Sequence, residues 1–353
     1  MKEIRQPEQT GGSAVLVAGA TGFVGAHVTR ELINQGFTVY AIARNEGKLR
    51  QLLGINYSDR LMILQGDLLN KEDLVKLEYE LANRVETLDF VVQTIGGGPL
   101  TSNPVFADSI FDLNYRTTCN LVRILEMSQK VASLKLFVYF SSLAAMGMPQ
   151  RGGKQILYNE ASDCNPVLPY EKAKFDTETF LRGVADNHRF KTVVLRFPQI
   201  YGGSDDAFMQ MIRLIRKGLF PVIRDRIGTL PLINIRDVVG ATLAIIQNPH
   251  KIPGKYDVQL VCEGSHSYSR LVDLVKKKYG QGGMLRIPYS LMYIGTAFIE
   301  RAFRVLGKPE PLNRRRLISL TKDRVVDCMT FVKMFQFKFE ENAENFIASH
   351  PTE

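Results

Sequence analysis

Val-Ala-Gly-Ala-Thr-Gly-Phe-Val-Gly, residues 17–25, decides how the first half of this chain folds. The stretch spaces Gly19, Gly22 and Gly25 in a G-x-x-G-x-x-G pattern. Glycines at these positions allow a tight turn, let the backbone approach a pyrophosphate and let a helix pack closely on a strand. When a strand precedes such a turn and a helix follows it, the helix offers free N–H groups and a positive dipole end to the phosphates.

The flanking sequence predicts both of these elements. Residues 14–18 form a short apolar run, which predicts a buried strand, and Val24, Val28 and Leu32 recur at helical spacing. A plain strand–helix turn is the alternative, but the strand–helix units that follow favour a dinucleotide-binding turn. The residues expected to contact the dinucleotide here are Gly19, Thr21, Gly22, Phe23, Val24 and Gly25.

Apolar strands and amphipathic helices continue to alternate along the first half of the chain. We predict strands over residues 37–43, 61–65, 88–95, 136–141 and 192–197, and helices over 46–53, 71–82, 106–128 and 170–187. Strands that are continuously apolar are typical of parallel sheets covered on both faces. The pattern predicts an α/β protein with a Rossmann-type, doubly wound parallel sheet.

The second half is less regular and carries more glycine and proline. We expect a polar N-terminal tail over residues 1–12, a dinucleotide-binding domain over 13–200, and a small, discontinuous substrate-binding or lid region over 201–353. Some elements of this last region are expected to return to the first domain. Helices are predicted over 267–279 and 288–306.

The composition excludes several classes of protein. Hydrophobic residues make up 45% and charged residues 23% of the 353, as in ordinary globular proteins. Lys and Arg exceed Asp and Glu by 45 to 36, a net charge of +9, but no basic block with interleaved aromatic residues is present and Trp is absent. These features argue against nucleic-acid binding. A small-molecule substrate is the expected partner.

The cysteines and the apolar segments bear on the cellular compartment in which the protein is expected. The four cysteines are far apart in sequence, with neither zinc-ligand spacing nor a disulfide framework. Their pattern predicts a reducing compartment and no metal site. The N-terminus lacks an apolar secretory core, and no run of about 18 apolar residues predicts a spanning helix. We expect a cytoplasmic protein.

Arg44 bears on the choice of cofactor. It ends the second predicted strand, where an acid would bind the ribose 2′-hydroxyl of NAD and a guanidinium suits the 2′-phosphate of NADP. Lys48 is placed to assist, and a solvated surface arginine is the alternative. The sequence favours NADP(H) and leaves NAD(H) open. Asp67 and Leu68 end the third strand near the expected adenine, although an Asx-turn or a helix cap also explains Asp67.

Tyr170 and Lys174 are four residues apart and therefore share one face of a predicted helix. A phenol has an ordinary pKa of about 10, too high for proton transfer at neutral pH. A neighbouring ammonium, together with an oxidised nicotinamide, is expected to lower that pKa by favouring the phenolate. Such a tyrosine moves a proton while the cofactor moves a hydride. A chance surface pair is the alternative when this spacing stands alone.

Other motifs accompany this pair. They are Asp67, Asn114, Ser141-Ser142, residues 195–202 (Leu-Arg-Phe-Pro-Gln-Ile-Tyr-Gly) and residues 235–238 (Ile-Arg-Asp-Val). Together with the glycine turn, they make nearly the whole chain resemble the extended branch of the short-chain dehydrogenase/reductase family. That branch includes nucleotide-sugar epimerases, hydroxysteroid dehydrogenases and dihydroflavonol-type reductases.

The resemblance implies roles for individual residues. Tyr170 would be the general acid/base, and Lys174 its modulator and a ligand of the cofactor ribose. Ser142 would bind the reacting oxygen, and Asn114 would support the helix or a proton relay. The family's usual dimer implies a homodimer packed through the helices that hold Asn114 and Tyr170.

The remaining cofactor contacts implied by the resemblance are less regular. Pro198 and Ile200 would flank the nicotinamide, and Thr94 and Gly96 would line the cofactor path. Residues 93–98 read Gln-Thr-Ile-Gly-Gly-Gly, where the family often has an H-x-A-A or N-A-G type of strand end. Residues 145–147 read Ala-Met-Gly, where many members have V-Y-G.

The resemblance also narrows the reaction. Leu143 and Ala144 replace the Asp-Glu pair of the sugar dehydratases and cannot move protons, which argues against dehydration. Residues 228–234 are largely apolar where nucleotide-sugar enzymes tend to place an arginine, although Arg224 and Arg226 lie close by in sequence. We therefore expect NADP(H)-dependent interconversion of a secondary alcohol and a ketone, on an apolar or moderately polar molecule. The alternatives are nucleotide-sugar epimerisation with tightly bound NAD, and a non-catalytic NADPH-binding subunit or sensor.

Residues 287–299 are apolar and aromatic, and Arg301 and Arg304 follow them. Basic triplets lie on either side in sequence, at 276–278 and 314–316. Three structures fit this pattern: a lid helix packed on the core, the wall of an apolar pocket, or an interfacial helix that touches anionic lipid.

Overall fold

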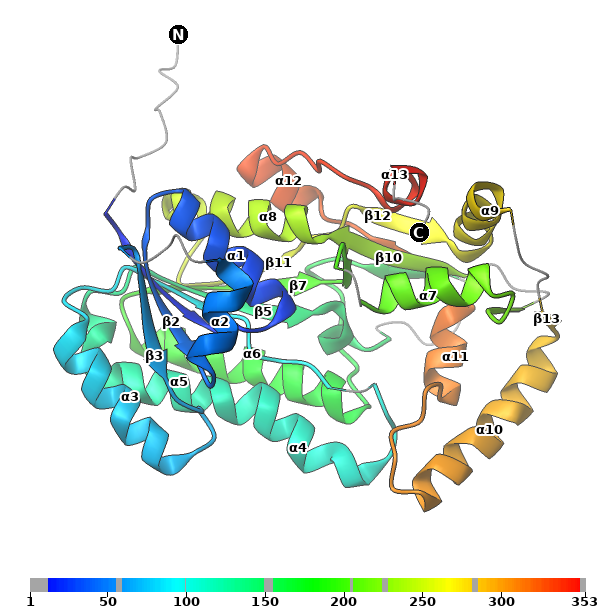
Figure 1. Ribbon diagram of the computed structural model, residues 1–353, viewed down its shortest axis with the longest axis horizontal. Helices are drawn as coiled ribbons and strands as arrows, with labels where there is room; N and C mark the ends of the chain where they lie inside the picture. Colours follow the sequence, from blue (N-terminus) through cyan, green and yellow to red (C-terminus); the bar gives the residue numbers. More distant parts are fainter. Residues whose placement is uncertain are drawn as a thin grey trace, which may run out of the picture.

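A parallel sheet runs through the centre of the computed structural model (Figure 1), which describes residues 12–54, 59–98, 100–148, 155–203, 206–223, 228–280 and 285–349. The sheet has seven strands in the order β11-β7-β5-β4-β1-β2-β3, and every neighbouring pair is parallel. The strands are β1 (Ala14–Ala18), β2 (Thr38–Ala43), β3 (Leu61–Gln65), β4 (Phe90–Gln93), β5 (Leu136–Ser142), β7 (Lys191–Phe197) and β11 (Tyr256–Leu260). The predicted Rossmann-type fold is confirmed.

Strand β1 explains why these strands are apolar on both sides. All five of its residues are buried. Val15 and Val17 belong to the core on one face of the sheet, whereas Leu16 belongs to the core on the other. A strand with two buried faces has no polar positions to alternate with apolar ones, so it appears in sequence as a continuous apolar run.

Helices cover the two faces of the sheet (Figure 1). One face carries α1 (Phe23–Asn34), α2 (Glu46–Leu53), α8 (Ile235–Gln247) and α12 (Met329–Phe335). The other carries α3 (Lys71–Arg84), α5 (Thr117–Met127) and α6 (Pro169–Asn187). Strand order reverses at β1, between β2 and β4, and the glycine turn leaves the carboxyl end of β1 at this point. Ligands of open α/β sheets bind at such a reversal.

The long helix predicted over residues 106–128 is not a uniform α-helix. It runs from α4 (Ala107–Phe111) through a π-helical turn (Asp112–Arg116) into α5. The carbonyl of Asn114, inside this wide turn, accepts hydrogen bonds from the hydroxyls of Thr118 (3.2 Å) and Thr177 (3.3 Å). Side-chain donors thus satisfy a carbonyl in the widened turn, and π-turns of this kind are frequent at functional sites.

The less regular half of the chain forms small sheets and helices beside the main sheet. The small sheets are β12 (Gly264–Ser267)–β10 (Thr229–Asn234)–β8 (Gln199–Tyr201), β13 (Leu285–Ile287)–β9 (Pro221–Ile223) and β14 (Asp323–Val326)–β6 (Gln155–Tyr158). The helices are α7 (Ala207–Arg216), α9 (Tyr268–Tyr279), α10 (Tyr289–Val305), α11 (Arg314–Leu320) and α13 (Ala343–Ser349). Strand β11 joins the main sheet although it comes late in the chain. The domain boundaries at residues 12 and 200 stay a prediction.

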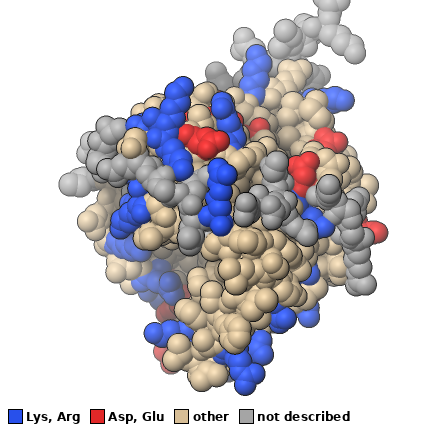
Figure 2. All heavy atoms as spheres, turned by 90° about the vertical axis from the view of Figure 1, so that its right-hand side faces the viewer, with Lys and Arg blue, Asp and Glu red and all other residues tan. Residues whose placement is uncertain are grey.

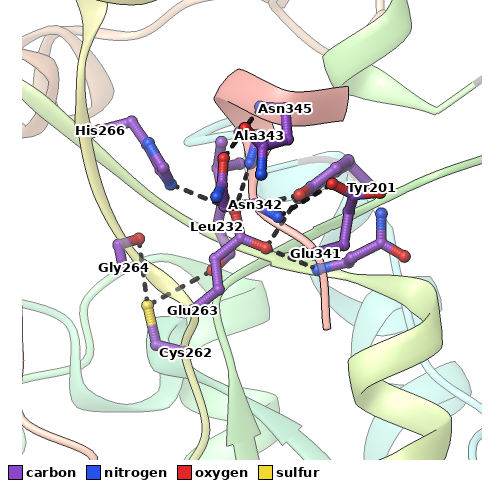
Figure 3. A network of polar contacts seen from close by, with 11 residues as sticks. Tyr201, Leu232, Cys262, Glu263, Gly264, His266, Glu341, Asn342, Ala343 and Asn345 are labelled. Atoms are coloured by element: carbon purple, nitrogen blue, oxygen red, sulfur yellow. Dashed lines mark hydrogen bonds and ion pairs between the residues drawn. The ribbon is translucent and has the colours of Figure 1, made fainter. Parts of the chain in front are cut away.

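A buried carboxylate fastens the C-terminal segment to this region (Figure 3). Glu263 accepts hydrogen bonds from the hydroxyl of Tyr201 (2.9 Å) and from the backbone N–H groups of Asn234 (3.1 Å) and Ala343 (2.8 Å). The ring of His266 lies 3.1 Å from the same carboxylate. Burial and this carboxylate together raise the pKa of Tyr201. The contacts hold α13 against β8 and β10, behind the larger cavity described below.

None of the helices in the described ranges combines the length and apolar composition that a bilayer span requires.

Candidate active site

Two cavities lie at the carboxyl ends of the central strands, on either side of the loop Gly96–Gly98. The smaller, of about 210 Å³, is lined by the glycine turn, the ends of β2 and β3, and residues 94–96. The larger, of about 550 Å³, is lined by Gly98, Ser142 and Tyr170 and by residues of the C-terminal half. The arrangement places a candidate cofactor site next to a candidate substrate site.

The glycine turn leaves no room for side chains. Gly19 has φ +92°, and a Cβ there would lie 2.5 Å from the Thr94 hydroxyl oxygen. A Cβ on Gly25 would lie 2.1 Å from the Gly19 carbonyl oxygen, because α1 packs directly on the turn. Gly22 caps α1 without a side-chain hydrogen bond. The first-turn N–H groups of α1 thus face a backbone-lined cradle, which fits a pyrophosphate.

Several of the residues predicted to bind the cofactor line one of the two cavities. Those that line the smaller cavity are Gly19, Thr21, Gly22, Arg44, Asp67, Leu68, Thr94 and Gly96. Pro198 lines the larger cavity.

The other predicted cofactor residues lie outside both linings. The Phe23 ring packs near Gly203, where a Cβ would lie 2.7 Å from it. Val24 and Ile200 pack against the core on the face of the sheet that carries α1. Lys48 is exposed on α2. Gly25 serves the packing of α1 on the turn.

Arg44 and Asp67, which both line the smaller cavity, form an ion pair. The Arg44 guanidinium lies 3.5 Å from the Asp67 carboxylate, and its side chain is 76% exposed. Asp67 also accepts a hydrogen bond from the N–H of Leu69 (2.9 Å), the Asx-turn considered above, whereas Asn70 caps α3. The exposed ion pair contributes little to stability, so Arg44 can exchange this partner for another anion.

Lys174 and Asn114 converge on Gly96. The Lys174 ammonium donates a hydrogen bond to the carbonyl of Phe140 (2.8 Å). A Cβ on Gly96 would lie 2.5 Å from Lys174 Nζ and 2.9 Å from Asn114 Oδ1. The Asn114 amide group both donates to the Gly97 carbonyl (2.8 Å) and accepts from the Gly97 N–H (3.0 Å). The two side chains therefore fix the loop that separates the cavities.

Tyr170 and Ser142 meet at the wall of the larger cavity. Both side chains line it. The Ser142 hydroxyl oxygen also accepts the N–H of Ala144 (3.1 Å), which fixes its position at the end of β5. The structure thus brings together all four residues predicted to be catalytic, Asn114, Ser142, Tyr170 and Lys174, around the loop Gly96–Gly98.

The electrostatics of this group differ from the expectation of an acidified phenol. Burial raises the pKa of Tyr170 above its ordinary value, and the nearby Ser142 hydroxyl only opposes this. Burial also lowers the pKa of Lys174 to about 7, against the opposing effect of Glu178. A lysine that loses its proton near neutral pH is a weak source of positive charge. In the protein alone, Tyr170 therefore remains protonated.

A buried ion pair behind the site was not predicted from the sequence. Arg196 on β7 and Glu178 on α6 are both buried, with 2.6 Å between guanidinium nitrogen and carboxylate oxygen. Ser141 donates its hydroxyl to the same carboxylate (2.5 Å). Glu178 lies four residues after Lys174, so helical spacing alone could have identified it. The pair locks α6 to β5 and β7.

Arginines in the larger cavity were also not assigned to the site. Arg315, Arg316 and Arg324 line it together with apolar residues such as Leu230. Arg315 pairs with Glu171 (2.9 Å). Within the described ranges, neither Arg316 nor Arg324 forms an ion pair with a carboxylate. Arg224 and Arg226, the cations considered from the sequence, lie outside those ranges.

In the part of the chain that the structure describes, no group of three or more His, Cys, Asp or Glu side chains is placed to hold a metal ion.

Comparisons with known proteins agree with this geometry. A family model described as the NAD dependent epimerase/dehydratase family matches residues 15–260. A UDP-glucose 4-epimerase of Pisum sativum is 28% identical over 234 residues, 63% of this chain and 62% of the pea protein. A decarboxylating sterol-4-alpha-carboxylate 3-dehydrogenase of Dictyostelium discoideum is 25% identical, over 84% of this chain and 87% of its own. This chain thus spans less than two thirds of the pea protein it matches.

A solved structure shows the same fold. The UDP-glucose 4-epimerase of Bifidobacterium longum, in complex with NAD+ and UDP, superposes with a TM-score of 0.70 at 17% sequence identity, over 96% of both chains. Its match extends through the C-terminal half of this chain. At this identity the likeness shows the fold and not the substrate.

Lys174→Gln tests the low pKa of Lys174. The unfolded chain holds this proton to about pH 10, whereas the folded chain releases it at about 7. Unfolding therefore takes up a proton between these values, so the stability contributed by Lys174 rises with pH, by at most ~1.4 kcal/mol per pH unit. The free energy of unfolding of the wild type, relative to the variant, should rise by about 2 kcal/mol from about pH 7.5 to 9 in urea titrations.

The exposed Lys76 on α3 provides the control, because the difference between wild type and Lys76→Gln should not change with pH. A wild-type advantage over Lys174→Gln that is flat across this range would show that Lys174 has an ordinary pKa.

Proposed function

Since this chain belongs to the NAD dependent epimerase/dehydratase family, we propose that it is an NADP(H)-dependent enzyme that interconverts a secondary alcohol and a ketone. The observation that carries the proposal is the position of Tyr170 and Ser142. Both line the larger cavity beside the loop Gly96–Gly98, where Asn114 hydrogen-bonds to Gly97 and Lys174 packs against Gly96.

The protein has groups that fit each part of the cofactor. The glycine turn would hold the pyrophosphate, Arg44 the 2′-phosphate, and Lys174 the ribose next to the nicotinamide. When bound, the nicotinamide would supply or accept the hydride. Loop Gly96–Gly98 has no side chains, so the cofactor could pass between the two cavities along its backbone.

Tyr170 is the proton donor in the proposed reduction. Burial raises its pKa, so the phenol carries its proton at neutral pH and can deliver it to the carbonyl oxygen as charge develops there. Ser142, which lines the same cavity as Tyr170, would orient that oxygen. Lys174, with a pKa of about 7, can exchange a proton near neutral pH and favours return of the proton during oxidation.

The larger cavity suits an alcohol or ketone that is apolar and carries an acidic group. Leu143, Ala144 and Leu230 supply apolar walls, whereas Arg316 and Arg324 supply cations that no described carboxylate pairs with. A carboxylate or phosphate on the substrate would satisfy these cations. The sterol-carboxylate dehydrogenase among the relatives, by its name, acts on a substrate of this kind. This proposal adds an anionic group to the apolar substrate expected from the sequence.

Nucleotide-sugar epimerisation is the second candidate. The same two arginines could meet a diphosphate, and several relatives are UDP-glucose 4-epimerases by name. Epimerisation would use Tyr170 and Ser142 in the same way but would return the hydride to the sugar, so the cofactor would show no net oxidation.

Tyr170→Phe tests the proton transfer. With NADPH and a panel of keto acids and keto steroids, the variant should lose about 10²–10⁴-fold in kcat, because general acid catalysis is worth this much. Its affinity for NADPH, measured by fluorescence, should stay within about twofold, since the phenol lies at the substrate cavity. Sugar interconversion without net NADPH oxidation would support the epimerase. Turnover that survives in Tyr170→Phe would overturn the proposed mechanism.

Arg44→Asp tests the choice of cofactor. A charge-assisted guanidinium–phosphate contact is worth roughly 1.5–3 kcal/mol, so NADPH affinity should fall about 10–100-fold. The affinity for NADH, which lacks the 2′-phosphate, should be retained and serves as the internal control. NADPH binding that is unchanged in the variant would show that Arg44 is only a surface residue.

Arg316→Gln tests the acidic substrate group. The KM for a keto acid should rise about tenfold or more with kcat little changed, because the lost contact binds a part of the substrate that does not react. The KM for the methyl ester of the same compound should not change. The exposed Arg189→Gln is the matched control. Equal effects on acid and ester would contradict an anion-binding role.

A further inference from the structure

Helix α10 turns an apolar face to the outside of the molecule. Leu291, Ile294, Phe298 and Val305 are spaced by three, four and seven residues and therefore form one stripe along the helix. Their exposed fractions range from 54% for Ile294 to 82% for Val305. A helix on the surface of a water-soluble domain normally shows its polar face to solvent, so this face is inverted.

The fully buried residues of α10 are polar. Thr296 and Glu300 are its buried residues. Glu300 accepts hydrogen bonds from the backbone N–H (2.6 Å) and from the guanidinium Nε (2.9 Å) of Arg314 at the start of α11. The ion pair fastens α10 to the body of the protein by its polar side. The apolar stripe is therefore not needed for packing, and no residue of α10 lines either cavity of the candidate site.

Positive charge surrounds this stripe. Arg286, Arg301, Arg304 and Lys308 are exposed, whereas the single acidic residue between 285 and 308 is the buried Glu300. Figure 2 shows this side of the molecule as a broad neutral surface with Lys and Arg around much of its rim. An apolar face edged by arginines is the composition of helices that lie in the headgroup region of an anionic membrane.

We propose that α10 docks this protein on an anionic lipid bilayer, lying in the plane of the interface. A helix of 17 residues extends about 25 Å, enough to insert a row of side chains without crossing the bilayer. The basic side chains would meet the anionic headgroups while Leu291, Ile294 and Phe298 enter the acyl boundary.

A second copy of this chain fits the same face less well. A two-fold contact through α10 would bury Arg301 and Arg304 of both copies, and the segment offers no exposed acid to compensate them. An anionic lipid surface neutralises these charges instead. Because α10 contacts α11, which carries Arg315 and Arg316, membrane docking would also bring the wall of the larger cavity close to the bilayer.

The absence of Trp from the chain allows a direct test by fluorescence. F298W places a single reporter on the stripe, and Y79W places one on α3 at a matched position, since the two side chains are 70% and 69% exposed. Vesicles of phosphatidylcholine alone, and of an equimolar mixture with phosphatidylserine, are added to each full-length variant. Emission from F298W should shift to the blue with the anionic vesicles, and emission from Y79W should not.

A second pair of variants separates the apolar from the electrostatic contribution to membrane binding. I294Q should reduce co-sedimentation of the protein with anionic vesicles about tenfold, through the lost apolar burial. R301Q/R304Q should reduce it about fivefold for each charge removed. If the emission of F298W shifts with neither kind of vesicle, the proposal is overturned. A blue shift that grows with protein concentration without vesicles would assign the face to a second copy and would also overturn it.

Discussion

The site depends on the burial of one ammonium group. Lys174 is enclosed between the carbonyl of Phe140, the ring of Tyr139 and the backbone at Gly96. This position is possible only because residue 96 has no side chain. It also requires Asn114 to hold the neighbouring Gly97, and the π-helical turn places that asparagine. The glycine loop, the widened helix and the low pKa of the lysine are thus consequences of the same close packing.

Burial also decides the protonation states of the site. The cost of holding a charge away from water lowers the pKa of Lys174 and raises that of Tyr170, so both groups favour their neutral forms. Glu178 and Arg196 form a buried charged pair, because each charge has a partner within hydrogen-bond distance. A protonated phenol beside a lysine that holds its proton weakly suits a site that delivers a proton to a carbonyl oxygen.

The sequence predicted the parts of the structure that local patterns encode. Continuous apolar runs identified six of the seven strands of the main sheet, all except β11. The four-residue spacing of Tyr170 and Lys174 placed both on α6. The π-turn at Asn114 was missed because hydroxyl donors such as Thr177, far away in sequence, help satisfy its carbonyl. Arg324 was missed because strand β14 reaches the site by pairing with β6, more than a hundred residues earlier. In the protein alone the pKa of Tyr170 is raised, because the pair is deeply buried, and spacing in the sequence reveals a neighbouring ammonium but not this burial.

Two features of the C-terminal half combine apolar surface with basic side chains. The larger cavity joins apolar walls to two arginines, and α10 joins an apolar stripe to a rim of basic side chains. Both patterns match molecules with an apolar body and an anionic group, one as substrate and the other as surface.

The measurement that tests the central claim most directly is native mass spectrometry of the purified protein with added NADPH and NADH. The account predicts one dinucleotide bound per chain, with the phosphorylated form preferred. A chain that binds neither dinucleotide would contradict it.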